Sequence, residues 1–100
     1  MAIKVVVEFQ AKPGSRAELA SVLEHISATL GRSLPGFLGG VLYEGLDSPD
    51  ALVEIADWDS AHAQAAAVEH AMRSGVYAPV IELVAAPFQI TRITQLNMRQ

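Results

Sequence analysis

The chain has 100 residues, of which 51% are hydrophobic and 18% charged, and its formal net charge is −4. This length supports one hydrophobic core, and the composition is that of a folded domain rather than a disordered segment. A negative charge without a lysine or arginine cluster argues against nucleic acid and anionic membranes as partners. The absence of cysteine excludes disulfides, thiolate metal sites and cysteine catalysis. We therefore expect one domain over residues 1–100.

The first ten residues, MAIKVVVEFQ, do not have the pattern of a signal peptide. Their apolar run is interrupted by Lys4 and Glu8 and is not followed by a small-residue cleavage site. No uncharged apolar run approaches the ~20 residues that a membrane helix needs. The sequence thus predicts a cytoplasmic protein that does not enter the membrane.

The N-terminal third predicts a strand followed by a helix. Residues 3–10 are rich in β-branched side chains that alternate in polarity, which is typical of a strand. Apolar residues then recur at spacings of three and four over 15–30, as in an amphipathic helix. Ser15 and Glu18 fit a capping box at its start. Gly31 is expected to end the helix in the left-handed conformation.

The remaining expected elements are strands over 37–46 and 51–58, helices over 60–74 and 79–85, and a last strand over 88–96. Gly39 and Gly40, inside the first of these strands, predict a bulge or a close backbone approach. Asp59 or Ser60 can cap the longer helix, and Gly75 follows it.

This order of elements predicts a ferredoxin-like α+β fold, β-α-β-β-α-β, with an antiparallel four-stranded sheet and two helices on one face. The first three strands carry apolar residues on both faces, as where Val6 stands opposite Val5 and Val7. Because two helices cover only one face, the second apolar face predicts a partner. We expect a homodimer that packs sheet against sheet around a two-fold axis.

Three sequence stretches carry a resemblance to a known family: VVEFQAKPG, PGFLGGVLYEGLDSPDALVEIADW and DSAHAQA. The chain resembles the antibiotic biosynthesis monooxygenase (ABM) family of small dimeric α+β barrels over about residues 3–96. The most specific features are Pro-Gly before the second strand and Trp-x-Ser where the third strand meets the second helix. Members include cofactor-independent oxygenases of anthrones and hydroquinones, and haem-degrading enzymes. The resemblance therefore implies a homodimeric barrel with a small aromatic substrate, no metal and no other cofactor.

The resemblance transfers to individual positions only in part. Trp58 occupies the position of the family's junction tryptophan. Glu54 stands where many of the oxygenases have an asparagine, and Ala67 stands where a helix histidine is often found, with His70 nearly one turn later. The haem-degrading enzymes need asparagine, tryptophan and histidine together, which disfavours that branch for this chain.

The resemblance implies an oxygenase that acts on a polycyclic phenol or anthrone, or on a hydroquinone. Once deprotonated, such a substrate passes an electron to O₂ itself. The protein then supplies an apolar pocket, a base and donors to the developing oxyanion. We assign Trp58 and Arg92 to stabilising the anion, and His70 or His62 to removing the proton. The pocket wall and the remaining substrate contacts are assigned to four residues: Phe9, Tyr43, Glu54 and Met72.

Each of these assignments has a structural alternative. Trp58 can anchor the second helix to the sheet. His62 and His70 can simply be solvated on the exposed face of that helix, as histidines on helices commonly are. His62 and His70 are eight residues apart, ~12 Å along a helix axis, which is too far to share a metal ion. Arg92 lies on an apolar strand face, so it should meet a carboxylate such as Glu54 or Glu8, a ligand anion or a dimer partner.

Two other functions fit the same sequence. An isomerase or aromatic cyclase on this barrel needs a base and a shaped pocket but no oxygen, so oxygen consumption discriminates it from an oxygenase. A non-catalytic dimeric module that binds small molecules needs no base. A well-formed cavity beside Trp58 would count against a module whose pocket is filled by side chains.

Overall fold

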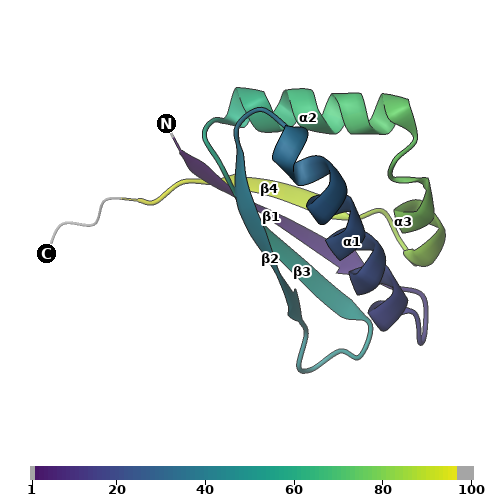
Figure 1. Cartoon of the computed structure of the whole chain (residues 1–100). Coiled ribbons are helices and arrows are strands. Elements are labelled where there is room, and N and C mark those ends of the chain that lie inside the picture. Colours follow the sequence, from purple (N-terminus) through teal and green to yellow (C-terminus); the bar gives the residue numbers. More distant parts are fainter. Residues whose placement is uncertain (1, 97–100) are drawn as a thin grey trace, which may run out of the picture.

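Four strands form one antiparallel sheet in the order β2-β3-β1-β4, with the helices on one side of it (Figure 1). This computed structural model describes residues 2–96. The elements in chain order are β1 (Ile3–Gln10), α1 (Arg16–Leu30), the 3-10 helix η1 (Gly31–Ser33), β2 (Phe37–Glu44), β3 (Ala51–Trp58), α2 (Ala61–Ser74), α3 (Ala78–Leu83) and β4 (Gln89–Ile93). The predicted ferredoxin-like α+β fold is confirmed.

The core lies between the sheet and helices α1 and α2. On β1, Val5, Val7 and Phe9 are buried at alternate positions, as the predicted strand periodicity requires. Leu19 and Leu23, one helical turn apart on α1, are buried against them. The two periodicities meet in one layer of apolar side chains, which holds the helices to the sheet.

The ends of α1 differ from the prediction. Ser15 is at the N-cap, but its side chain makes no capping hydrogen bond, so the capping box is not formed. Gly31 has a right-handed φ of −53° rather than a left-handed one, because the chain continues into η1. A Cβ at Gly31 would lie 2.8 Å from the ring of Phe37, so the glycine allows a close approach there.

The ends of α2 agree with the prediction. The Ser60 hydroxyl accepts a hydrogen bond from the backbone N–H of Ala63 at 3.0 Å. Gly75 ends the helix with a φ of 76°, in the left-handed region that glycine tolerates best. Both signals act locally, which is why the sequence located them correctly.

The predicted irregularity of β2 is a bulge with a consequence for the side-chain pattern. Phe37 pairs with Trp58 but Gly39 pairs with Asp57, so β2 contains one extra residue between these pairs. The bulge shifts the alternation, and Phe37 therefore shares the helix-facing side with Leu42. Tyr43 points to the opposite face and is 51% exposed. The predicted placement of Tyr43 beside Phe9 in the pocket wall is wrong.

The face of the sheet turned away from the helices is called the open face. Its apolar members in the described residues are Val6, Val41, Tyr43, Val53, Ile55 and Ile93. Across its centre, Ile55 pairs with Val41 on one side and Val6 on the other, which makes a continuous apolar row. Val41 is 55% exposed, since nothing in residues 2–96 packs over it.

The C-terminal part of the chain is shorter in regular structure than predicted. Strand β4 ends at Ile93 instead of residue 96, and α3 spans Ala78–Leu83 instead of 79–85. Strand β2 likewise ends at Glu44. Within residues 2–96, no helix is long and apolar enough to span a membrane.

Candidate functional site

A cavity of about 170 Å³ lies between the sheet and helices α1 and α2. It is bounded by side chains from all four strands, both long helices and the segment after α2. An apolar cavity of ~150 Å³ is known to hold benzene. The cavity therefore has room for a single aromatic ring.

Aromatic side chains flank the two ends of the cavity. At one end, the rings of Phe37 and Trp58 meet edge to face, with centroids 5.2 Å apart. At the other end, Phe88 lies 5.2 Å from Phe9 and 6.3 Å from Tyr77. Strand register separates the two groups, because Phe9 pairs with Leu52 at the far end of the strand that carries Trp58. Such walls favour a flat aromatic ligand through edge-to-face and stacked contacts.

The Pro-Gly motif before β2 fixes the Trp58 end of the cavity. Gly36 has a φ of +85°, and its carbonyl accepts a hydrogen bond from the backbone N–H of Asp59 at 2.8 Å. A Cβ at Gly36 would lie 2.7 Å from the Cβ of Ala63, so a side chain there would displace α2. The glycine thus ties the start of β2 to the junction of β3 and α2, and it sets Phe37 against Trp58.

Glu54 is the carboxylate of the cavity, and its neighbours are apolar. In the sheet it pairs with Leu42 of β2 and Val7 of β1. Within residues 2–96 it forms no salt bridge. Burial without a compensating cation disfavours the charged form and raises the pKa of Glu54 above its ordinary 4.5.

Tyr77 is the second titratable group that lines the cavity. It follows Gly75 at the end of α2, and its ring packs against Phe88. Burial raises the pKa of Tyr77, and the nearby Glu54 carboxylate raises it further. The phenol therefore stays protonated and can donate a hydrogen bond where the carboxylate can accept one.

Gln64 brings an amide to the cavity from α2. Its side chain is only 3% exposed, and its Oε1 accepts a hydrogen bond from Nε of Arg92 at 2.6 Å. Arg92 was expected to meet a carboxylate such as Glu54 or Glu8, a ligand anion or a dimer partner. Within the described residues it pairs with neither carboxylate, and the antiparallel register of β4 brings it to Gln64. Arg92 is exposed and does not line the cavity.

The structure brings together half of the residues assigned from the sequence. Trp58, Phe9, Glu54 and Met72 line the cavity. Met72 lies at its edge and is 53% exposed. Tyr43 lies on the open face, as described above.

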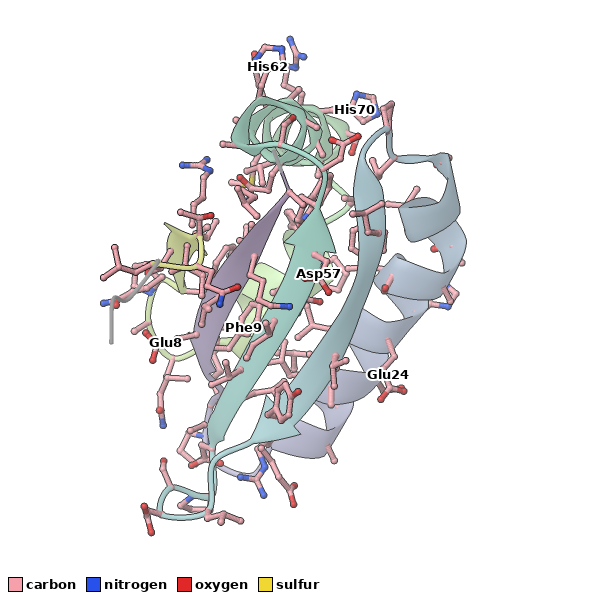
Figure 2. The ribbon with its side chains drawn as sticks, turned by 90° about the vertical axis from the view of Figure 1, so that its left-hand side faces the viewer. Glu8, Phe9, Glu24, Asp57, His62 and His70 are labelled. Carbon is pink, nitrogen blue, oxygen red and sulfur yellow. The ribbon has the colours of Figure 1, made fainter. Side chains whose placement is uncertain are left out.

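His62 and His70 are not brought to the cavity. Both are exposed on α2, and Figure 2 shows His62 on the side of the helix that points away from the sheet and His70 on the flank of the helix towards α1. They line a separate, wider groove between α1 and α2. The reason is helical phase, because the buried stripe of α2 runs through Gln64, Ala67 and Ala71.

Sequence reasoning missed Gln64 and Tyr77. Gln64 could have been found from helical spacing, since it precedes Ala67 and Ala71 at intervals of three and four on the stripe that α2 buries. Tyr77 had no comparable signal, because it lies between α2 and α3 and reaches the cavity only through their packing.

Metal-ligating side chains do not gather anywhere in the described part of the chain. In particular, no three His, Asp or Glu residues among 2–96 are close enough to hold a metal ion together. The polar groups of the cavity are one carboxylate, one amide, one indole, one phenol and the Ser27 hydroxyl.

A model of the antibiotic biosynthesis monooxygenase (ABM) family matches residues 2–77, which include β1 to α2 and all of the cavity residues except those of β4 and its approach. The chain therefore belongs to the ABM family. A search among curated proteins finds no match.

Several solved structures share this fold. One is a putative antibiotic biosynthesis monooxygenase from Bordetella bronchiseptica, with 18% identity, a TM-score of 0.84, and 96% of this chain and 98% of that chain covered. Another is a mutant of SnoaB, a cofactor-independent oxygenase from Streptomyces nogalater, with 23% identity, a TM-score of 0.79, and coverage of 97% and 95%. Rv0793 from Mycobacterium tuberculosis has 24% identity, a TM-score of 0.74 and 100% coverage of both chains. At these identities the likeness concerns the fold.

Proposed function

We propose that this protein is a cofactor-independent monooxygenase that oxidises a phenolic or hydroquinone ring bound in the cavity. The observation that carries the proposal is Glu54, a carboxylate in an aromatic-walled cavity that forms no salt bridge with any described side chain. Its pKa is raised by burial, towards the range in which a general base works best near neutral pH. Glu54 replaces His62 and His70 as the candidate base, since neither histidine lines the cavity.

The proposed reaction begins when Glu54 accepts the proton of a substrate hydroxyl. The resulting phenolate gives one electron to O₂, and the radical pair combines into a peroxide on a ring carbon. Loss of the ring proton breaks the O–O bond, so one oxygen atom stays on the ring as a quinone carbonyl. The other oxygen takes up this ring proton and the proton that Glu54 returns, and it leaves as water. Substrate and O₂ thus yield a quinone and water without an external reductant.

Cavity size favours a one-ring substrate over the polycyclic phenol or anthrone that the resemblance implied. Three fused rings are too large for the cavity of about 170 Å³. A single hydroquinone ring is close in size to benzene, which a cavity of ~150 Å³ can hold. A larger substrate would have to extend into the groove between α1 and α2, whose volume is about 800 Å³. The groove and the cavity share five lining residues: Ile26, Leu34, Trp58, Val68 and Tyr77.

The open face supports a homodimer as part of this proposal. A central row of Val41, Ile55 and Val6 on an antiparallel sheet favours burial against a second copy. The open-face residues line neither the cavity nor the groove, so we assign the open face to assembly and the cavity to substrate.

An isomerase or cyclase would use the same base and the same pocket, and oxygen uptake separates it from an oxygenase. The cavity beside Trp58 counts against a module whose pocket is filled by side chains.

The test compares oxygen uptake by the wild type and Glu54→Gln with a panel of hydroquinones and phenols. The substitution keeps the shape and removes the base, so uptake should fall by roughly 10²–10⁴-fold. Ligand quenching of Trp58, the only tryptophan, should persist and show that the cavity is intact. His62→Ala and His70→Ala are the controls and should stay within about twofold of the wild type. Equal uptake by Glu54→Gln would refute the assignment.

A further inference from the structure

Among the side chains that the structure describes, Gln64 is the one polar side chain that is buried. It stands on the stripe of α2 that otherwise presents Ala67 and Ala71 to the interior. A buried amide costs free energy unless it is hydrogen-bonded. The one hydrogen bond observed for the Gln64 side chain, to Arg92, therefore determines how the amide is oriented.

The hydrogen bond to Arg92 fixes whether Oε1 or Nε2 of the Gln64 amide faces Arg92. A guanidinium only donates hydrogen bonds, so Gln64 must present its Oε1 to Nε of Arg92. The reversed amide would set two donors against each other. The Nε2 amino group is therefore directed away from Arg92, and no described side chain accepts a hydrogen bond from it.

Geometry separates the two partners. Gln64 lines the cavity, whereas Arg92 lies outside it on the edge strand β4 and is exposed. Arg92 is held in place by the register of β4, in which it pairs with the buried Val5. The guanidinium thus acts on the cavity only through the amide, and its positive charge polarises that amide and strengthens it as a donor.

We propose that the Nε2 group of Gln64 donates a hydrogen bond to the anionic oxygen of the bound substrate, and that Arg92 is a positioning residue that holds the amide in this orientation. The inference rests on the proposed function for the class of ligand, a phenolate. It replaces the direct role of Arg92 in anion stabilisation that the sequence suggested. The cavity then contains an acceptor for the proton, Glu54, and a donor for the oxygen that loses it.

The probe is 4-nitrophenol, a one-ring phenol whose visible absorbance reports its ionisation and which needs no turnover. We measure its binding through quenching of Trp58, and the pH at which the bound probe ionises through its absorbance. Nitrobenzene, which lacks the hydroxyl, is the matched control ligand.

Gln64→Met keeps the length of the side chain and removes the donor. It should weaken binding of the phenolate roughly tenfold or more, with the bound probe ionising at higher pH, and leave nitrobenzene unaffected. Arg92→Met should weaken phenolate binding about threefold to tenfold, since the amide is then free to turn. Arg92→Lys retains a donor to Oε1 and should stay within about twofold of the wild type. Gln64→Met/Arg92→Met should match Gln64→Met alone.

Equal phenolate binding by the wild type and Gln64→Met would overturn the proposal while leaving the oxygenase function intact. Additive losses in the double variant would show that Arg92 reaches the ligand directly and would overturn its positioning role. The predicted binding pattern without any oxygen uptake would support the inference and refute the oxygenase. Failure of the wild type to bind any one-ring phenol would refute both.

Discussion

The two faces of the sheet are built from the same strands but end in different environments. On β3, Glu54 points to the helices and into a cavity, whereas its neighbour Ile55 points to the open face. A carboxylate is thus enclosed among apolar side chains, while an isoleucine lies outside the helix-covered core. Both placements are unfavourable for a monomer in water. The carboxylate loses hydration when it is buried, and the isoleucine leaves apolar surface in contact with water.

The difference indicates where function and assembly lie. Burying a carboxylate on the covered face costs free energy, and such a group is typical of a functional site, where it binds a ligand or accepts a proton. Apolar side chains on the open face gain free energy only when a partner covers them. Three changes, taken from the largest expected effect to the smallest, test this contrast.

The largest effect is expected at the centre of the open face. In the proposed homodimer, Ile55→Lys places two lysines at the two-fold interface, and the buried charges should weaken dimerisation by at least about a hundredfold. Analytical ultracentrifugation would detect a monomer in place of a dimer. Glu24→Lys is the control because Glu24 is exposed on α1, away from the sheet (Figure 2), and should leave the dimer unchanged. A dimer that survives Ile55→Lys would contradict an interface on the open face.

A smaller effect is expected on stability when the carboxylate of the covered face is removed. The folded protein binds the proton of Glu54 more tightly than the unfolded chain, because burial raises the native pKa. The free energy of unfolding therefore falls as pH rises from 4.5 through the native pKa. Glu54→Gln carries no such penalty.

Thermal unfolding of both proteins at about pH 4 and about pH 8 checks this sign. Glu54→Gln should raise Tm by a few degrees relative to the wild type at the higher pH, and by less at the lower pH. The other titratable group facing Glu54 is Tyr77, so Tyr77→Phe in the same background is the control for coupling. A constant difference between the two pH values would contradict a buried, titrating Glu54.

The smallest effect is expected for the ion pair on the open face. Lys4 Nζ lies 2.7 Å from Oδ1 of Asp57, and both side chains are more than half exposed. In the Ile55→Lys background, Lys4→Ala should change the free energy of unfolding by about 0.5 kcal/mol or less, since exposed pairs contribute little. Chemical denaturation measures this. A distinctly larger loss in the wild-type background would show that a partner covers the pair.

Local signals in the sequence were sufficient for most of the fold. The alternation over residues 3–10, the Ser60 cap and Gly75 were read correctly because each depends on neighbours along the chain. The Ser15 capping box was wrong, although its residues fit the motif, because the backbone at Ser15 does not bring its hydroxyl to the helix N–H groups. A motif allows such a bond but does not enforce it.

The candidate site was predictable only where a strand alone set the direction of a side chain. Trp58, Glu54 and Phe9 were placed correctly, since two-residue periodicity assigns them to one face of neighbouring strands. Tyr43 was misplaced because a single bulge reverses the alternation of β2. The histidines lie outside the cavity because their phase on α2 places them off the stripe that the helix buries.

The sequence by itself thus determined the order of the elements, the family, and the apolar character of both faces of the sheet. Only the tertiary structure decided that Tyr77, which lies between α2 and α3, reaches the cavity. It also decided that Arg92 meets Gln64 rather than a carboxylate. The physical reason is that hydrogen bonds between distant segments depend on register and packing, which no local pattern of residues specifies.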